Sequence, residues 1–150
     1  MFAHYAGESS DGDSLQGAIM SKMTVLRMLC DHPELVRLSA RFYDDPDTQM
    51  GSEYASDLDR LGLLEPLKQS PKMRACIDVV TEILAENPRN KIVLFSTFVP
   101  TLSFLQQAFP NVGSVQFHGK MDAKQKDAAK QQFARDADCR IFLLQLYLMV

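Results

Sequence analysis

The second half of the chain alternates short apolar runs with helical patterns, and this alternation constrains the fold more than any other feature. The expected strands are Lys91–Phe95, Ser114–Phe117 and Arg140–Leu144. Apolar residues at helical spacing lie before and between these strands. Strands that alternate with helices predict a parallel sheet with right-handed crossovers and flanking helices. The continuous run at 91–95 indicates a strand that is covered on both faces.

Capping residues mark the helices of this α/β part. Ser70 is a good N-cap, and Pro71 suits the first helical position, where its missing N–H costs nothing. Another helix is expected over Pro100–Phe109. Asp122 and Gln125 form a capping box, which predicts the start of a third helix.

The residues before this part predict a mainly helical extension with acidic loops. Apolar residues recur at helical spacing over Leu15–Cys30. His32 and Pro33 interrupt the pattern, because the residue before a proline is disfavoured in the α region. We therefore expect two domains, a helical extension at 1–68 and an α/β domain at 69–150.

Composition and charge exclude several classes of protein. Of the 150 residues, 46% are hydrophobic and 23% are charged, which favours a buried core over disorder. The net charge of −3 argues against a strongly basic nucleic-acid tail. Three widely spaced cysteines argue against a disulfide framework or a zinc site and favour an intracellular location. No apolar run is long enough for a membrane span, and the N-terminus lacks a signal-peptide pattern, so no membrane partner is expected.

The sequence contains no motif that identifies a catalytic residue or a set of metal ligands. The sequence has no Gly-x-x-x-x-Gly-Lys-Ser/Thr phosphate loop, no Gly-x-Gly-x-x-Gly and no Gly-x-Ser-x-Gly. In parallel sheets, however, ligands bind at the carboxyl ends of the strands. Ser96-Thr97 follows the first expected strand and His118-Gly119 follows the second. Each pair suits a phosphate contact or a simple turn.

A local basic run follows the second expected strand. Its members are Lys120, Lys124, Lys126, Lys130 and Arg135, partly offset by Asp122 and Asp127. This pattern is typical of a solvated helix surface, and it equally suits contacts with phosphate groups.

Read in order, several segments resemble the second RecA-like lobe of Swi/Snf-type ATPases, the DNA-translocase branch of helicase superfamily two. They are Leu26–Pro33, Ser70–Lys72, Lys91–Phe98, Phe117–Gly119 and Arg140–Leu144. The order of Leu-Arg-x-x-Cys-x-His-Pro, Ser-x-Lys and an apolar run ending in Phe-Ser-x-Phe is fairly specific. The resemblance covers about 20–144, with a variable insert near 42–68, and implies a partial RecA-like lobe.

The resemblance implies that this lobe contacts the backbone of double-stranded DNA. The residues carried over are Ser96, Thr97, His118, Gly119, Lys120 and Lys126. In the family, ATP and Mg²⁺ lie between two lobes, and the second lobe supplies arginines to the transition state. ATP and Mg²⁺ are thus expected for a complete two-lobed enzyme and not for this chain alone.

The sequence departs from the family pattern in two places, and these limit which of the family's site residues and activities are implied for this chain. The family has an arginine seven residues after the glycine that matches Gly119, and here Lys126 occupies that position without the bidentate guanidinium fork. After Leu144, the family's Ser/Thr-x-x-Gly-Gly-x-Gly motif and arginine-finger helix do not follow. We therefore expect a truncated lobe that does not hydrolyse ATP alone.

The residues leave two other interpretations open. Ile141–Val150 is apolar except for Gln145, and a chain that ends so needs a partner to cover it, either the first ATPase lobe or another protein. The chain could thus be a non-catalytic interaction protein that docks through its C-terminus. It could also be an unrelated α/β domain, such as a small-molecule enzyme.

Overall fold

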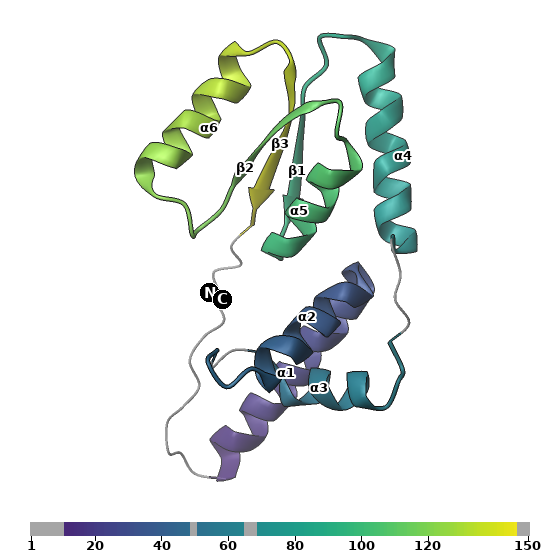
Figure 1. Ribbon diagram of the computed structural model, residues 1–150, viewed down its shortest axis with the longest axis vertical. Coiled ribbons are helices and arrows are strands. Elements are labelled where there is room, and N and C mark those ends of the chain that lie inside the picture. The colour runs from purple at the N-terminus through teal and green to yellow at the C-terminus, as the bar shows by residue number, and fades with distance from the viewer. Residues whose placement is uncertain (1–10, 49–50, 65–68, 147–150) are drawn as a thin grey trace. The chain divides into compact units, whose positions relative to one another are not determined.

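The computed structural model describes residues 11–48, 51–64 and 69–146 (Figure 1). The chain separates into two compact units, Met1–Lys72 and Met73–Val150. Among the described residues, no helix is long and apolar enough to cross a membrane. The predicted apolar docking segment lies partly outside the described residues, because only its part up to Leu146 is covered.

The first unit contains α1 (Asp11–Asp31), α2 (Pro33–Asp44) and α3 (Glu53–Arg60), as predicted for a mainly helical extension. The predicted break at His32 and Pro33 is confirmed. His32 is extended and is the N-cap of α2, and its buried Nδ1 accepts the N–H of Glu34 at 3.1 Å. The imidazole therefore caps the helix in the way that an Asn or Ser side chain usually does.

Buried apolar side chains lie on each of these three helices. The buried members are Val25, Met28, Leu35, Val36, Ala40 and Ala55. Ser52 caps α3 and also bonds to Ser21 of α1 at 3.0 Å. Lys72 Nζ lies 2.7 Å from the Asp31 carboxylate, which ties the end of this unit to the end of α1.

The second unit is α/β, as predicted. Its elements are α4 (Pro71–Glu86), whose first two residues belong to the first unit, β1 (Ile92–Ser96), α5 (Val99–Ala108), β2 (Gly113–Phe117), α6 (Ala123–Arg135) and β3 (Cys139–Gln145). The three strands are parallel and lie in the order β1-β3-β2, so β3 is central (Figure 1). The capping box that opens α6 is complete, with Asp122 and Gln125 bonded to each other's backbone N–H.

Helices cover the two faces of this sheet unequally. Side chains of α4 and α5 pack on one face, around Leu102, Ile141 and Leu143. On the other face, α6 packs over β2 and β3, where Ala129 and Phe133 contact Phe142 or its neighbours. Two helices therefore share one face, and one helix covers part of the other.

The prediction that the first strand is covered on both faces is wrong. Val93 is 42% exposed and Phe95 is 61% exposed. The pairing register places Val93 beside Phe142 and Phe95 beside Leu144, on the face that carries α6. Because α6 packs over β2 and β3, this face of β1 has no described helix on it. A continuous apolar run indicates a strand but does not say how many helices reach it.

Candidate nucleic-acid interface

The carboxyl ends of the three parallel strands meet at one end of the sheet, here called the strand-end edge. Ser96 ends β1 and lies in register with Gln145 at the end of β3, while Phe117 ends β2 and pairs with Leu144. The predicted residues Ser96 and Thr97 therefore lie on the same edge as the loop that follows β2. This is the edge where ligands bind in open parallel sheets.

Hydrogen bonds join the residues of this edge across the strands. Leu146 N–H donates to the carbonyl oxygen of Ser96 at 2.8 Å. Gly119 N–H donates to the side-chain oxygen of Gln145 at 3.1 Å. Gln145 thus connects the end of β3 with the loop after β2, a role that we did not predict. The available signal was that Gln145 is the single polar residue in the apolar stretch Ile141–Val150.

The turn after β1 presents a hydroxyl that is already oriented. Ser96 Oγ accepts the N–H of Phe98 at 3.1 Å. A hydroxyl that accepts a bond still has its own hydrogen to donate, so Ser96 can donate to an oxygen of a ligand. Thr97 is half-buried on the same turn, two residues before α5 begins.

Two lysines of α6 flank the aromatic ring at the end of β2. Lys126 Nζ lies 5.7 Å and Lys130 Nζ lies 6.0 Å from the ring centroid of Phe117. Such cation–π contacts contribute about 0.5–1 kcal/mol each where the cation stays hydrated. Lys130 is also paired with Asp127 at 2.9 Å, whereas Lys126 is half-buried. The ring therefore holds two ammonium groups beside the strand end.

His118 lies near positively charged lysine side chains, and their charge affects the pKa of its ring. Burial lowers the pKa of His118 below its ordinary value of 6.5, and the nearby charges of Lys120 and Lys126 lower it further. Its Nδ1 atom is buried and has no hydrogen-bond partner in the described part of the chain. At neutral pH the ring is therefore mostly uncharged, and a neutral imidazole offers one N–H donor and one acceptor nitrogen.

Of the six predicted site residues, the structure links five. Gln145 places Gly119 beside the end of β3, where Ser96 lies in register, and the pKa of His118 reflects the proximity of Lys120 and Lys126. The remaining residue, Thr97, follows Ser96 in the chain and lies on the same edge.

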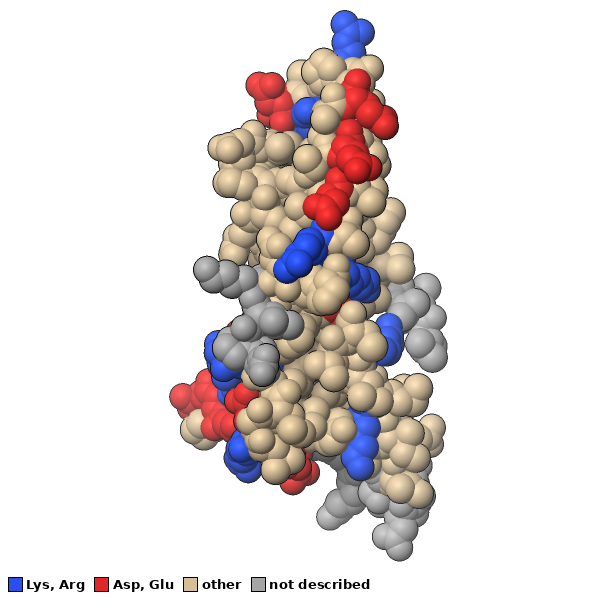
Figure 2. All heavy atoms as spheres, turned by 90° about the vertical axis from the view of Figure 1, so that its right-hand side faces the viewer, with Lys and Arg blue, Asp and Glu red and all other residues tan. Residues whose placement is uncertain are grey.

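The opposite sign of charge gathers on another surface of the second unit. Asp78, Glu82 and Glu86 are exposed at four-residue intervals along α4. Figure 2 shows this side of the molecule with its row of acidic side chains. The basic residues of α6 and the acidic row of α4 lie on different helices, so a net charge of −3 conceals a local positive edge.

No group of three His, Cys, Asp or Glu side chains in the described ranges is arranged to hold a metal. Burial raises the pKa of the Cys139 thiol, so this cysteine is a poor nucleophile. The chemistry that the edge does offer is hydrogen-bond donors and ammonium groups, which bind phosphate oxygens.

The family model described as "Helicase conserved C-terminal domain" matches residues 72–149. ATP-dependent helicase ULS1 of Saccharomyces cerevisiae is 24% identical over 127 residues, covering 73% of this chain and 8% of that protein. The chain therefore spans a small part of that relative.

Two solved structures are also similar. The C-terminal part of the Fun30 ATPase domain has a TM-score of 0.48 and 20% identity, covering 75% of this chain and 33% of that one. The C-terminal domain of the Sulfolobus solfataricus SWI2/SNF2 ATPase also has a TM-score of 0.48, with 14% identity and coverage of 75% and 57%.

The family match includes all three strands and the predicted interface. It begins at Lys72 in the Ser-x-Lys segment and continues past the end of β3, and so spans more than half of the chain. The predicted resemblance to the C-terminal lobe of a helicase is thereby confirmed. This chain belongs to the helicase conserved C-terminal domain family.

Proposed function

We propose that this chain contributes contacts to the backbone of double-stranded DNA within an ATP-dependent DNA translocase of the Swi/Snf type. The contacts are made by the strand-end edge, through Ser96, Thr97, His118, Gly119, Lys120 and Lys126. The observation that carries the proposal is the placement of Lys126 and Lys130 around Phe117, beside the hydroxyl and amide groups of the strand ends. Such groups contact phosphates without reading base sequence.

The contacts of each residue define different roles in this proposal. Lys120 is exposed and Lys126 is half-buried, so both can place a charge near a phosphate. Ser96 supplies a hydroxyl hydrogen. The N–H of Gly119 is already bonded to Gln145, so it reaches a phosphate only after the glutamine side chain turns away. Lysine at 126 provides charge without a guanidinium fork, which favours weak and sequence-independent binding.

Binding to a short DNA duplex at several salt concentrations tests the proposal. We expect the double variant Lys120→Gln, Lys126→Gln to bind more weakly than the unchanged chain. The slope of log affinity against log salt concentration should also be shallower for this variant, by about 0.9 for each DNA phosphate that it no longer neutralises. The weakening should be the same for duplexes of unrelated sequence.

Lys22→Gln is the matched control. Lys22 also lies over an aromatic ring, with its Nζ 5.6 Å from the ring centroid of Tyr54, but it belongs to α1 in the first unit. This variant should bind DNA as the unchanged chain does. Equal weakening for the control and the double variant, or binding that does not respond to salt, would contradict the proposal.

A further inference from the structure

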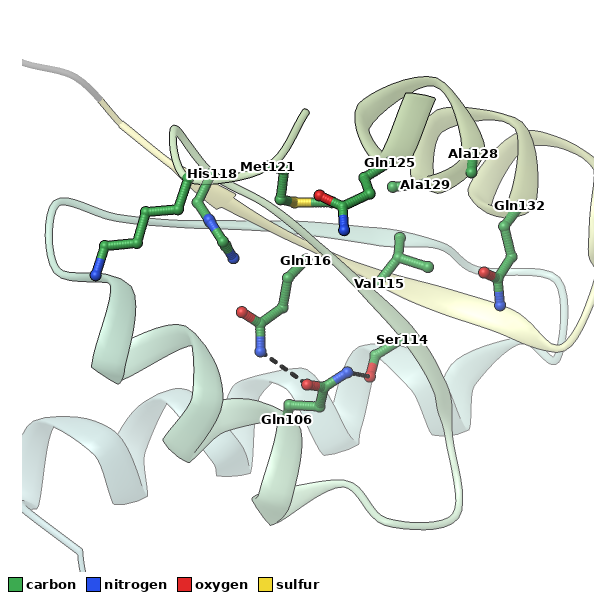
Figure 3. Close-up of a pocket in the computed structure, with 11 residues that line it drawn as sticks. Gln106, Ser114, Val115, Gln116, His118, Met121, Gln125, Ala128, Ala129 and Gln132 are labelled. Carbon is green, nitrogen blue, oxygen red and sulfur yellow. Dashed lines mark hydrogen bonds between the residues drawn. The ribbon is translucent and has the colours of Figure 1, made fainter. Parts of the chain in front are cut away.

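A hollow of about 610 Å³ runs beside β2, between α5 and α6. Figure 3 shows the residues that line it, which come from both helices, from β2 and from the loop after β2. His118 and Lys120 lie at the strand-end side, and the rest of the lining is separate from the proposed DNA contacts.

The strand that borders this hollow has one free edge among the described strands. β2 pairs with β3 alone, and the sheet order β1-β3-β2 puts it at the margin. Alternate residues of an edge strand present backbone N–H and C=O groups that need partners. Edges are usually protected by prolines or charged side chains. The sequence of β2, Gly-Ser-Val-Gln-Phe, has neither.

The two sides of the hollow differ in chemistry. On the α5 side, Gln106 Nε2 donates to Ser114 Oγ at 3.1 Å, and Gln116 Nε2 donates to Gln106 Oε1 at 2.7 Å. These hydrogen bonds form a polar wall (Figure 3). A glutamine oxygen accepts two bonds, so Gln106 retains one acceptor position and Gln116 keeps its own oxygen for a ligand.

The α6 side combines an apolar wall with two glutamines. Val115, Met121, Ala128 and Ala129 form the wall, of which Val115 and Ala129 are buried, and Gln125 and Gln132 also line this side. Figure 3 shows Val115 on the opposite side of β2 from Ser114 and Gln116. Successive side chains of an extended segment point to opposite faces. A strand added at β2 would therefore place every second side chain against the polar wall and the others against the apolar one.

We propose that the free edge of β2 binds an extended peptide segment of a partner protein by strand addition. The segment alternates side chains that form hydrogen bonds, such as threonine, with small apolar side chains, such as valine. Backbone hydrogen bonds to β2 supply affinity, and the two walls supply register, because a shift by one residue would reverse both sets of side chains. This protein-binding surface shares His118 and Lys120 with the proposed DNA contacts, and its other lining residues are separate from them.

A synthetic peptide tests the proposal with the full chain. The probe is a capped nine-residue peptide with seven alternating threonines and valines between terminal glutamates. We expect it to bind, with the largest amide chemical-shift changes in nuclear magnetic resonance spectra along Gly113–Phe117. A peptide of the same composition with the valines grouped together should bind at least tenfold more weakly. Methylation of alternate backbone nitrogens on one edge of the probe should also abolish binding.

Two exposed alanines of α6 give a matched pair of variants. Ala128 lines the hollow and Ala134 does not. Ala128→Glu places a charge on the apolar wall and should weaken binding at least tenfold, whereas Ala134→Glu should leave it unchanged. Equal binding of both peptides, shifts away from β2, or equal affinities of the two variants would overturn the proposal. So would a dimer of the chain that Ala128→Glu dissociates, because the edge would then bind a second copy.

Discussion

At the scale of single residues, His118 makes the stability of the chain depend on pH. The folded chain holds its pKa below the ordinary value of 6.5, so the unfolded chain binds the proton more readily. The stabilisation is therefore complete above pH 6.5 and decreases as the pH falls below it, until the lower pKa of the folded state is reached. We expect the free energy of unfolding to decline from pH 7.5 to pH 5.5.

Urea unfolding followed by circular dichroism at several pH values measures this effect. His118→Gln removes the titrating group but keeps a polar side chain. Its free energy of unfolding should change less over the same interval than that of the unchanged chain. Parallel pH profiles for the two proteins would show that His118 is not the group responsible.

Arg140 is a second residue whose role depends on three-dimensional contacts. Its Nη2 donates to the carbonyl oxygens of Leu84 at 2.7 Å and Asn87 at 2.8 Å, and its Nε donates to that of Asn90 at 3.0 Å. The side chain thus binds carbonyl oxygens near the end of α4 from the neighbouring strand β3. Neither capping signals nor charge patterns indicate this role, because the partners lie far away in the chain.

At the scale of elements, two glycines should respond oppositely to the same substitution. A Cβ at Gly113, where β2 begins, would lie 2.4 Å from the carbonyl oxygen of Asp138, so Gly113→Ala should destabilise the second unit by about 1–3 kcal/mol. Gly17 lies within α1, and nothing is within 4 Å of a Cβ there. Gly17→Ala should stabilise α1 by about 0.5–1 kcal/mol.

Hydrogen exchange of backbone amides measures these two effects separately, because each variant is followed in its own unit. Protection of the β2 and β3 amides should decrease in Gly113→Ala, while protection in α1 should increase in Gly17→Ala. Unchanged exchange in β2 and β3 of the Gly113 variant would show that the backbone at Asp138 moves aside without cost.

Elements that are determined by adjacent residues could be predicted from the sequence. The break at His32 and Pro33, the capping box at Asp122 and the three parallel strands are all found in the structure. Features determined by tertiary packing could not be predicted. The exposure of Phe95 depends on where α6 packs, and the bond from Gly119 to Gln145 depends on strand order. Strand order is not contained in the pattern of any one segment.

At the scale of the whole molecule, the uncovered face of β1 should cause self-association. Phe95 is 61% exposed, so Phe95→Lys should change the free energy of unfolding by no more than about 0.5 kcal/mol. Sedimentation at increasing protein concentration should show less association than for the unchanged chain.

Phe142→Ala is the contrasting variant, because Phe142 is buried on the same face and its truncation should cost about 3–5 kcal/mol. A strongly destabilised Phe95→Lys variant would mean that this face is packed in solution.

ATP hydrolysis and contact with DNA require different chemical groups. ATP hydrolysis requires a loop that holds the phosphates and acidic groups that hold Mg²⁺, and the 150 residues contain no Gly-x-x-x-x-Gly-Lys-Ser/Thr motif. DNA binding at the strand-end edge needs neither. We therefore expect the purified chain to bind duplex DNA in a salt-dependent manner while releasing no more phosphate from ATP than a buffer control, with or without DNA. Phosphate release that DNA stimulates, and that persists through further purification, would mean that this chain carries a hydrolytic site of a different kind.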